Sequence, residues 1–243
     1  MLKESLKPLI DLVYPPRCPS CGVAVGEQGA LCTDCWSDLV IPGEPACAMC
    51  SRPFGNDDIA AESVCGVCLA EPPKHDGIYA ATLYNDLSRK LVLAFKHGSK
   101  IALSRLLAQM IVARMPEMDG EWLVVPVPLH FVRQWQRGFN QSALLAREIA
   151  KARDLEMLVD GLQRPKATPS LGGLGAKERE RALAGAVRAH PKRAGQLKGA
   201  QILLVDDVMT SGATTNACLK ALRKAGAKRV RIACFARVMD DAL

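Results

Sequence analysis

The pattern of hydrophobic and polar positions near the end of the chain predicts a buried strand followed by a helix. Residues 202–205 are all apolar and show no polar face, as expected of a strand covered on both sides of a parallel sheet. Apolar residues then recur at spacings of three from Leu219 to Ala225, a helical pattern that Gly226 closes. The polar segment 206–214 therefore joins the end of a strand to the start of a helix.

Upstream of this segment, predicted strands and helices alternate. An amphipathic helix is indicated where Leu103, Leu107 and Ile111 fall on one face. Asn140 suits the N-cap of a later helix, and the prolines that end at Pro128 belong at the close of a strand. The predicted strands are 77–84 and 122–128, and the predicted helices are 87–97, 102–115 and 142–152. This order indicates an α/β fold with a parallel sheet flanked by helices.

Two further segments have no sustained hydrophobic period. Residues 133–141 carry Arg133 and Arg137 and are interpreted as a cationic loop that leads into the helix at 142–152. Residues 161–186 are rich in glycine, proline and charged side chains, and are interpreted as a mobile loop.

The first third of the chain contains eight cysteines arranged as four Cys-x-x-Cys pairs. Two residues between cysteines allow both sulfurs to face one metal, and two such pairs supply the four thiolates of a structural zinc site. An interleaved grouping, in which the first pair joins the third, stays open. The preferred grouping is local, with one Zn²⁺ on Cys18, Cys21, Cys32 and Cys35 and another on Cys47, Cys50, Cys65 and Cys68.

Disulfide bonds and redox catalysis are weaker interpretations of these cysteines. Disulfides need an oxidising compartment, whereas residues 1–16 are charged early and interrupted by Pro8, unlike a signal peptide. We therefore expect a cytoplasmic protein. A dithiol enzyme would need one pair rather than four, so the two zinc ions are expected to be structural and to supply much of the folding energy of this segment. Cys218 and Cys234 stand apart and are expected to be buried thiols.

Charge divides the chain into an acidic part and a basic part. Residues 1–75 hold 5 Lys and Arg against 10 Asp and Glu, whereas residues 76–243 hold 27 against 15. A basic surface suits a strongly anionic small molecule or a nucleic-acid backbone, and charge alone does not choose between them. Aromatic residues make up 5% of the chain, so no base-stacking surface is indicated. No run of eighteen apolar residues occurs, so no membrane insertion is expected.

The segment 206–214 combines the residue types that bind a phosphorylated sugar. Backbone N–H groups at the start of a helix are unsatisfied and favour a phosphate, and Gly212 allows the backbone to come close to it. Thr210, Ser211 and Thr214 offer hydroxyl donors. The adjacent charges of Asp206 and Asp207 repel each other unless a cation or hydrogen-bond donors, such as sugar hydroxyls, compensate them. A plain strand–turn–helix with an acidic cap would not need the Thr-Ser-Gly-x-Thr sequence that follows.

Residues 202–214 resemble the 5-phosphoribosyl-1-pyrophosphate (PRPP) signature of the type I phosphoribosyltransferases. The resemblance implies a type I phosphoribosyltransferase fold and PRPP bound together with Mg²⁺. It also implies that Asp206 and Asp207 are the catalytic pair that holds the ribose hydroxyls. The residues that would wrap the 5′-phosphate are Met209, Thr210, Ser211, Gly212, Ala213 and Thr214.

Four other motifs extend the resemblance to the ComF (ComFC) family, from about Leu9 to Val238. They are Tyr14-Pro-Pro-Arg-Cys-Pro-Ser-Cys-Gly22, Phe95-Lys-His-Gly98, Val125-Pro-Val-Pro128 and Arg137-Gly-Phe-Asn-Gln141. Members of this family carry a double zinc ribbon and a phosphoribosyltransferase-like domain, and are linked to natural competence and DNA uptake in bacteria. The resemblance implies a zinc-ribbon module over residues 1–72 and a phosphoribosyltransferase-like domain over residues 73–243.

The resemblance also assigns cationic residues to the pyrophosphate of PRPP. The segment from Pro128 to Arg137 would lie where this fold binds pyrophosphate, so Arg133 and Arg137 become phosphate contacts. Residues 161–186 would form a lid over PRPP. Further cations expected to reach the pyrophosphate when the lid closes are Lys96, Arg164, Lys166, Arg179 and Arg181. The lid departs from the family pattern, with Leu171 in place of a glutamine and Ala182 in place of an asparagine.

Three functions are compatible with these features. The first is an enzyme in which a nucleophile displaces pyrophosphate from PRPP. The second is a non-catalytic adaptor that senses PRPP and binds single-stranded DNA or proteins of the competence machinery. The third, a zinc-ribbon nucleic-acid binder, is the least favoured because the ribbon segment is acidic.

Overall fold

The computed structural model of the chain describes residues 11, 13–55, 58–60, 62–97, 101–167 and 176–239. Its centre is a five-stranded sheet in which every pair of neighbouring strands is parallel. The strands, in spatial order, are β1 (Ile78–Leu83), β7 (Arg229–Arg237), β6 (Gln201–Met209), β2 (Trp122–Pro126) and β3 (Glu156–Met157). The predicted parallel sheet is therefore present.

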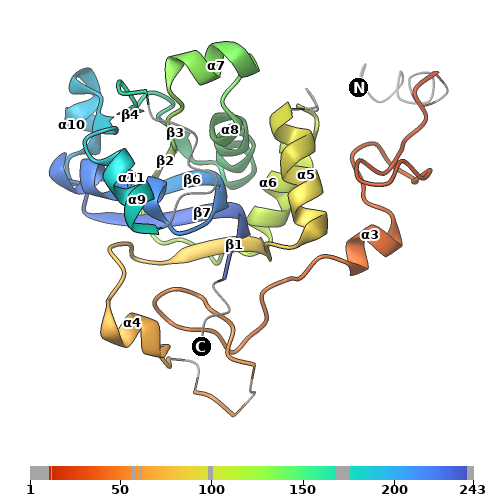
Figure 1. Ribbon diagram of the computed structural model, residues 1–243, viewed down its shortest axis with the longest axis horizontal. Coiled ribbons are helices and arrows are strands. Elements are labelled where there is room, and N and C mark those ends of the chain that lie inside the picture. The colour runs from red at the N-terminus through yellow and green to blue at the C-terminus, as the bar shows by residue number, and fades with distance from the viewer. Residues whose placement is uncertain are drawn as a thin grey trace.

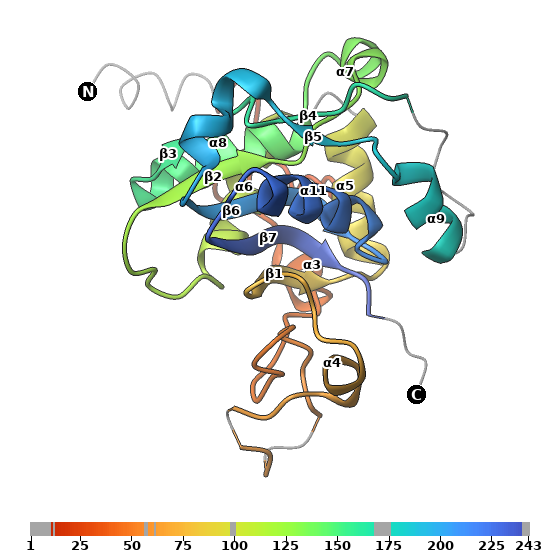
Figure 2. The same cartoon turned by 90° about the vertical axis from the view of Figure 1, so that its left-hand side faces the viewer.

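Helices cover both faces of this sheet (Figures 1 and 2). The helices on one face are α5 (Asp86–His97), α6 (Leu103–Val112) and α8 (Gln141–Arg153). The other face carries α11 (Ala213–Lys224) and α10 (Ala194–Leu197), the latter preceded by the 3₁₀ turn η1 (Pro191–Arg193). The remaining elements of this part are α7 (Phe131–Arg137), α9 (Ala176–Leu183), and the antiparallel pair of β4 (Leu162–Gln163) and β5 (Arg188–Ala189).

The core confirms the interpretation of residues 202–205 as a strand buried on both faces. Leu203 and Val205 pack among the helices of the first face, whereas Ile202 and Leu204 pack against the α11 side. All four side chains are fully buried. Side chains on a strand point alternately to opposite faces, so an unbroken apolar run is needed when both faces are covered.

The order of the strands places a crevice at the carboxyl ends of β2 and β6. From β2 the chain passes through α8 to β3 on one side, and from β6 it passes through α11 to β7 on the other side. Because these crossovers leave in opposite directions, the neighbouring strands β2 and β6 form a topological switch point, where open α/β sheets bind ligands.

One expectation about a loop is wrong. Residues 133–141 were expected to form a cationic loop, but most of this segment belongs to α7. His130 Nδ1 accepts the Val132 N–H at the start of α7, and Gly138 ends the helix with φ +79°. The segment 161–186, expected to be a mobile loop, contains β4, which pairs with β5, and the helix α9. Its mobility and its role as a lid stay predictions. Residues 168–175 lie outside the described residues.

Strand β6 is longer than its apolar run indicates. It continues through the acid pair to Met209, and α11 begins at Ala213, so only residues 210–212 separate the two elements. Val208 and Met209 still pair with Ala236 and Arg237 of β7. Pairing with a neighbouring strand thus extends β6 past the point where its own hydrophobic pattern stops.

The N-terminal segment contacts the sheet domain in two separate places (Figure 1). Its first half, with α3 (Thr33–Ser37), contributes Cys18, Cys35 and Leu39 to the core that contains Leu87 of α5. Its second half, with α4 (Gly66–Ala70), lies beneath β1 in the same view. The boundary between residues 72 and 73 stays a prediction. No helix within the described ranges is both long enough and apolar enough to cross a membrane.

Candidate functional site

The eight N-terminal cysteines form two tetrads with the predicted local grouping. Within each tetrad the four sulfur atoms lie within 4.8 Å of one another, so one ion can contact all four. The two tetrads consist of Cys18, Cys21, Cys32 and Cys35, and of Cys47, Cys50, Cys65 and Cys68. The interleaved alternative is therefore not the arrangement that the chain adopts.

The two tetrads begin with the same tight turn. The Cys18 N–H donates to the carbonyl of Val23, and the Cys47 N–H donates to the carbonyl of Arg52, each at 2.8 Å. The residue after the second cysteine of each turn has a positive φ, which is +79° at Gly22 and +56° at Ser51. The expectation of a left-handed glycine at Gly22 is confirmed, and Ser51 adopts the related conformation without the freedom of glycine.

The electrostatics of the tetrads favour a cation. Burial opposes ionisation of Cys18 and Cys47, but backbone N–H donors, including those of Cys21 and Cys65, outweigh it and lower both pKa values to about 6. Burial, followed by the neighbouring thiols, raises the pKa of Cys35 to about 12. Four adjacent thiols thus cannot all ionise without a counter-charge. The donor set fits structural zinc, with sulfur in every coordination position.

The acid doublet lies at the predicted position on β6, beside the switch-point crevice. Asp206 and Asp207 are 9% and 8% exposed. Ser142 Oγ, in the first turn of α8, donates to Asp206 Oδ1 at 3.0 Å, and the Asp207 N–H donates to the same oxygen at 2.9 Å. Burial, and then the neighbouring Asp207 charge, raise the pKa of Asp206 to about 7, although Lys96 and these donors oppose the rise.

Lys96 contacts the doublet directly, a contact that the sequence did not predict. Lys96 Nζ, at the end of α5, is 3.1 Å from Asp207 Oδ2. It was expected to reach a pyrophosphate when a lid closed, but it already forms an ion pair with one of the two acids. The ion pair is mostly buried, with side-chain exposures of 23% for Lys96 and 11% for Asp207.

Three arginines surround the same crevice. Burial, and the repulsion of Arg133, lower the pKa of Arg137, while Asp207 opposes this shift. Burial, and again the repulsion of Arg133, lower the pKa of Arg164. Arg137 Nη1 also donates to Gln141 Oε1 at 3.2 Å. These cations repel one another, so the arrangement favours a bound anion.

The other cations expected on the lid do not all lie near the doublet. Arg164 follows β4 and is half-buried near the doublet, so it belongs with the crevice. Lys166 and Arg181 are exposed, and the Arg179 side chain lies outside the described residues. Ser142 was missed by sequence reasoning because it is 64 positions from Asp206 and no local pattern predicts their contact.

The short turn 210–212 presents the N-terminus of α11. Gly212 is the N-cap, with φ +73°, and it makes no side-chain capping bond to the amides of the helix. Thr215 Oγ1 donates to the Gly212 carbonyl at 2.8 Å. A Cβ placed on Gly212 would lie 3.2 Å from Met209 Cε, so any side chain here would crowd Met209. Gly212 itself offers no side chain to cap the α11 amides, and a phosphate site at this helix start stays a prediction.

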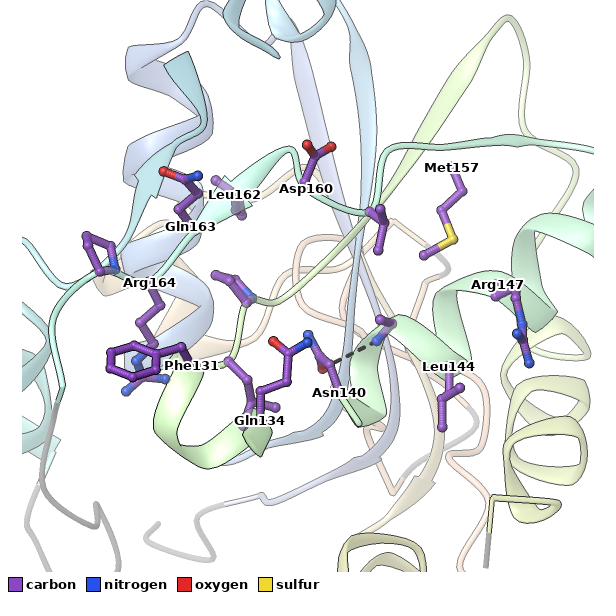
Figure 3. A pocket seen from close by; sticks show the side chains of 15 residues that line it. Phe131, Gln134, Asn140, Leu144, Arg147, Met157, Asp160, Leu162, Gln163 and Arg164 are labelled. Atoms are coloured by element: carbon purple, nitrogen blue, oxygen red, sulfur yellow. Dashed lines mark hydrogen bonds between the residues drawn. The ribbon is translucent and has the colours of Figure 1, made fainter. Parts of the chain in front are cut away.

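A cleft of about 810 Å³ lies next to this crevice, and the sequence did not predict it. It runs between α7 and α8 on one side and the segment 157–165 on the other; Figure 3 shows Gln134 and Asn140 facing Leu162 and Gln163 across it. Arg164 lines the cleft and also lies near Asp206. The cleft therefore adjoins the acid doublet through Arg164.

Comparison with known protein families agrees with this geometry. Residues 9–69 match the model of the double zinc ribbon domain, and residues 171–243 match that of the phosphoribosyl transferase domain. Together with the parallel sheet and the two cysteine tetrads, these matches define a phosphoribosyltransferase fold with an N-terminal double zinc ribbon. The expected fold class is thus confirmed.

Full-length relatives then identify the family. The DNA utilization protein YhgH of Salmonella typhi is 31% identical over 94% of this chain and 100% of its own length. Competence protein F of Haemophilus influenzae is 29% identical over 91% of this chain and 96% of its own. The chain belongs to the family of these proteins, which also includes competence protein ComFC of Streptococcus pneumoniae.

Among solved structures, the glutamine PRPP amidotransferase from B. subtilis superposes with a TM-score of 0.39. It is 17% identical, over 58% of this chain and 30% of that chain.

Proposed function

We propose that this chain binds PRPP together with Mg²⁺ at the carboxyl end of β6 and transfers its phosphoribosyl group to an acceptor, releasing pyrophosphate. One observation carries the proposal: the buried doublet of Asp206 and Asp207 lies beside the N-terminus of α11, whose N-cap is a glycine, and among four cationic side chains. Carboxylates accept hydrogen bonds from sugar hydroxyls, amides and hydroxyls bind phosphate, and arginines bind pyrophosphate.

The 5′-phosphate of PRPP would bind at residues 209–214. Gly212 is compatible with close approach of an anion, since its φ of +73° turns the chain directly into α11. Thr210 and Ser211 are exposed at the tip of the turn, and Thr214 lies in the first turn of the helix. The partial positive charge of the α11 N-terminus adds to these contacts.

The pyrophosphate would lie against Arg133 and Arg137, with Lys96 and Arg164 close by. Bound pyrophosphate would offset the burial, and the repulsion by Arg133, that lower the pKa of Arg137 and Arg164. In the transfer step, a nucleophile forms a bond to the anomeric carbon and the electron pair of the breaking C–O bond leaves with pyrophosphate. Cations fixed in this position stabilise that departing charge. The two carboxylates are the hard oxygen ligands that Mg²⁺ prefers, and the ion would further neutralise the pyrophosphate.

Calorimetry with PRPP, with and without Mg²⁺, tests the binding step. Magnesium-dependent binding that is lost when Asp206→Asn and Asp207→Asn are combined supports the proposal, and a wild-type protein that binds no PRPP overturns it. Release of pyrophosphate in the presence of a panel of nucleobases and amines then tests transfer. Binding without any release would leave a PRPP-binding protein that is not an enzyme.

A second function, that of an adaptor for single-stranded DNA, is favoured by the surface of α7. Phe131 and Trp135 are 70% and 86% exposed, and stand one helical turn apart on a helix that also carries Arg133 and Arg137. Exposed aromatic rings beside arginines suit unpaired bases and their phosphates. The low number of aromatic residues in the sequence gave no indication of this surface, because the exposure of a ring, not the number of rings, decides whether it can stack on a base.

The adaptor function predicts salt-sensitive binding of single-stranded DNA. The affinity for an oligonucleotide should fall steeply as salt rises, because phosphate contacts release counterions. Trp135→Ala should weaken binding by about 1–3 kcal/mol, the usual contribution of one stacked base. Tyr14→Ala, which removes an exposed aromatic ring from the N-terminal segment, is the matched control. A flat salt response, or equal affinities for both variants, would exclude α7 as the binding surface.

A further inference from the structure

One arginine ties the second cysteine tetrad to the end of the central sheet. Arg237 is the last residue of β7, and its Nη1 donates a hydrogen bond to the backbone carbonyl of Cys50, a member of that tetrad. The next residue, Ser51, donates from Oγ to the Ile78 carbonyl of β1 at 2.9 Å. The turn that begins the second tetrad is therefore held directly against the sheet.

The backbone of Arg237 also supports the turn at the start of α11. Arg237 lies opposite Met209 in the pairing of β6 with β7, and the Val238 N–H donates to the Met209 carbonyl at 2.9 Å. On its other side, the Tyr84 N–H donates to the Arg237 carbonyl at 2.8 Å. The end of β7 is thus fixed between β1 and β6, immediately before residues 210–212.

Met209 extends this connection to Gly212. Its Cε lies 3.2 Å from the position that a Cβ on Gly212 would take. Gly212 holds the left-handed conformation from which α11 begins. Any shift of the end of β6 would therefore change the packing around the residue that sets the direction of the α11 amides, since packed interiors transmit small displacements.

We infer that Arg237 is a positioning residue that couples zinc binding at the second tetrad to the conformation of residues 210–212. Zinc holds the Cys50 turn in place, the Cys50 carbonyl holds the Arg237 side chain, and Arg237 keeps the ends of β7 and β6 aligned. The consequence for PRPP rests on the proposed function, but the coupling itself is a property of the protein without ligand. Coupling between two sites is reciprocal, so a ligand held at residues 210–212 also retains the zinc.

Hydrogen exchange of the ligand-free protein tests the coupling. Arg237→Met should raise the exchange rates of the Asn216 and Val238 amides, which donate to the Gly212 and Met209 carbonyls, by about tenfold, the effect expected when a charge-assisted hydrogen bond is lost. The exchange rates of amides 202–205 should not change, and Arg237→Met should retain two zinc ions. Arg229→Met, at the exposed start of the same strand, is the matched control and should leave all of these exchange rates unchanged. Arg237→Lys, which keeps the charge and one donor, should give an intermediate increase.

Removal of zinc distinguishes coupling from simple fraying of a strand end. Removing zinc from the second tetrad of the wild-type protein should raise exchange of the Asn216 and Val238 amides as Arg237→Met does, and removing it from the variant should add little. The inference is overturned if the effects of zinc removal and of Arg237→Met on the exchange rates add, or if Arg237→Met alone does not raise these rates. PRPP should also slow zinc release to a chelator in the wild-type protein by about tenfold, and not in Arg237→Met. If calorimetry finds no PRPP binding, the proposed function fails, whereas the exchange result still decides the coupling.

Discussion

Lys96 Nζ lies 3.1 Å from Asp207 Oδ2, and this ion pair joins the end of α5 to the end of β6. The two residues are 111 positions apart in the sequence. The pair compensates part of the negative charge that a buried acid doublet concentrates in one place. It also leaves a lysine within reach of any phosphate that binds beside the doublet.

Removing this lysine should weaken binding of PRPP. In Lys96→Met, Asp207 loses its counter-charge and the ligand loses a nearby cation, so we expect about a tenfold lower affinity by calorimetry. Lys90→Met, on the exposed side of the same helix, is the matched control and should bind as the wild type does. Equal affinities for the two variants would show that Lys96 does not contribute to the ligand site.

The stability of the protein should depend on pH through Asp206. Its pKa is raised to about 7 by burial and by Asp207, so the folded state holds a proton that the unfolded state has already released. The free energy of unfolding therefore falls as pH rises through this pKa, by at most about 1.4 kcal/mol per pH unit. Asp206→Asn cannot ionise, and its stability relative to the wild type should increase from pH 6 to pH 8.

Thermal unfolding of the wild type and Asp206→Asn at several pH values measures this difference. Zinc content is checked at each pH, because loss of metal from the cysteine tetrads would add a separate change in stability. A constant difference between the two proteins across this range would mean that Asp206 is already ionised at pH 6.

The left-handed conformation of Gly212 should be needed for both stability and binding. Gly212→Ala places a Cβ at φ +73° and 3.2 Å from Met209 Cε, so unfolding should become easier by about 1–2 kcal/mol. PRPP affinity should fall as well. Gly199 has φ +76° with open space around it, so Gly199→Ala should cost similar stability but leave affinity intact. Loss of affinity in both variants would point to a general folding defect.

The local grouping of the cysteines gives a clear stoichiometry test. A double variant within one tetrad, Cys21→Ser with Cys32→Ser, should retain one zinc ion per chain because the second tetrad is complete. A double variant that spans both tetrads, Cys21→Ser with Cys65→Ser, should lose both ions. Elemental analysis of purified protein separates these outcomes, and an interleaved grouping would leave the first variant with no zinc.

Local patterns predicted the elements of the sheet domain well. The helix around Leu107 and Ile111 and the N-cap at Asn140 lie where the sequence placed them, because side-chain spacing and capping chemistry act over a few residues. The same reasoning took the segment containing Arg133 for a loop. A short helix such as α7, in which no residue is fully buried, leaves no hydrophobic period to detect.

The sequence by itself determined which chemical groups occur together in each local segment of this protein. It placed the acid doublet at the end of a buried strand, a glycine-containing turn at the start of a helix, and cysteines at the spacing of two metal sites, because each feature is encoded within a few neighbouring residues. Only the tertiary structure decided which distant groups meet these features. Ser142 and Lys96 reach the doublet, and Arg237 reaches Cys50, through strand order and helix packing. Such contacts depend on how whole elements pack against one another, and no local pattern of residues specifies that.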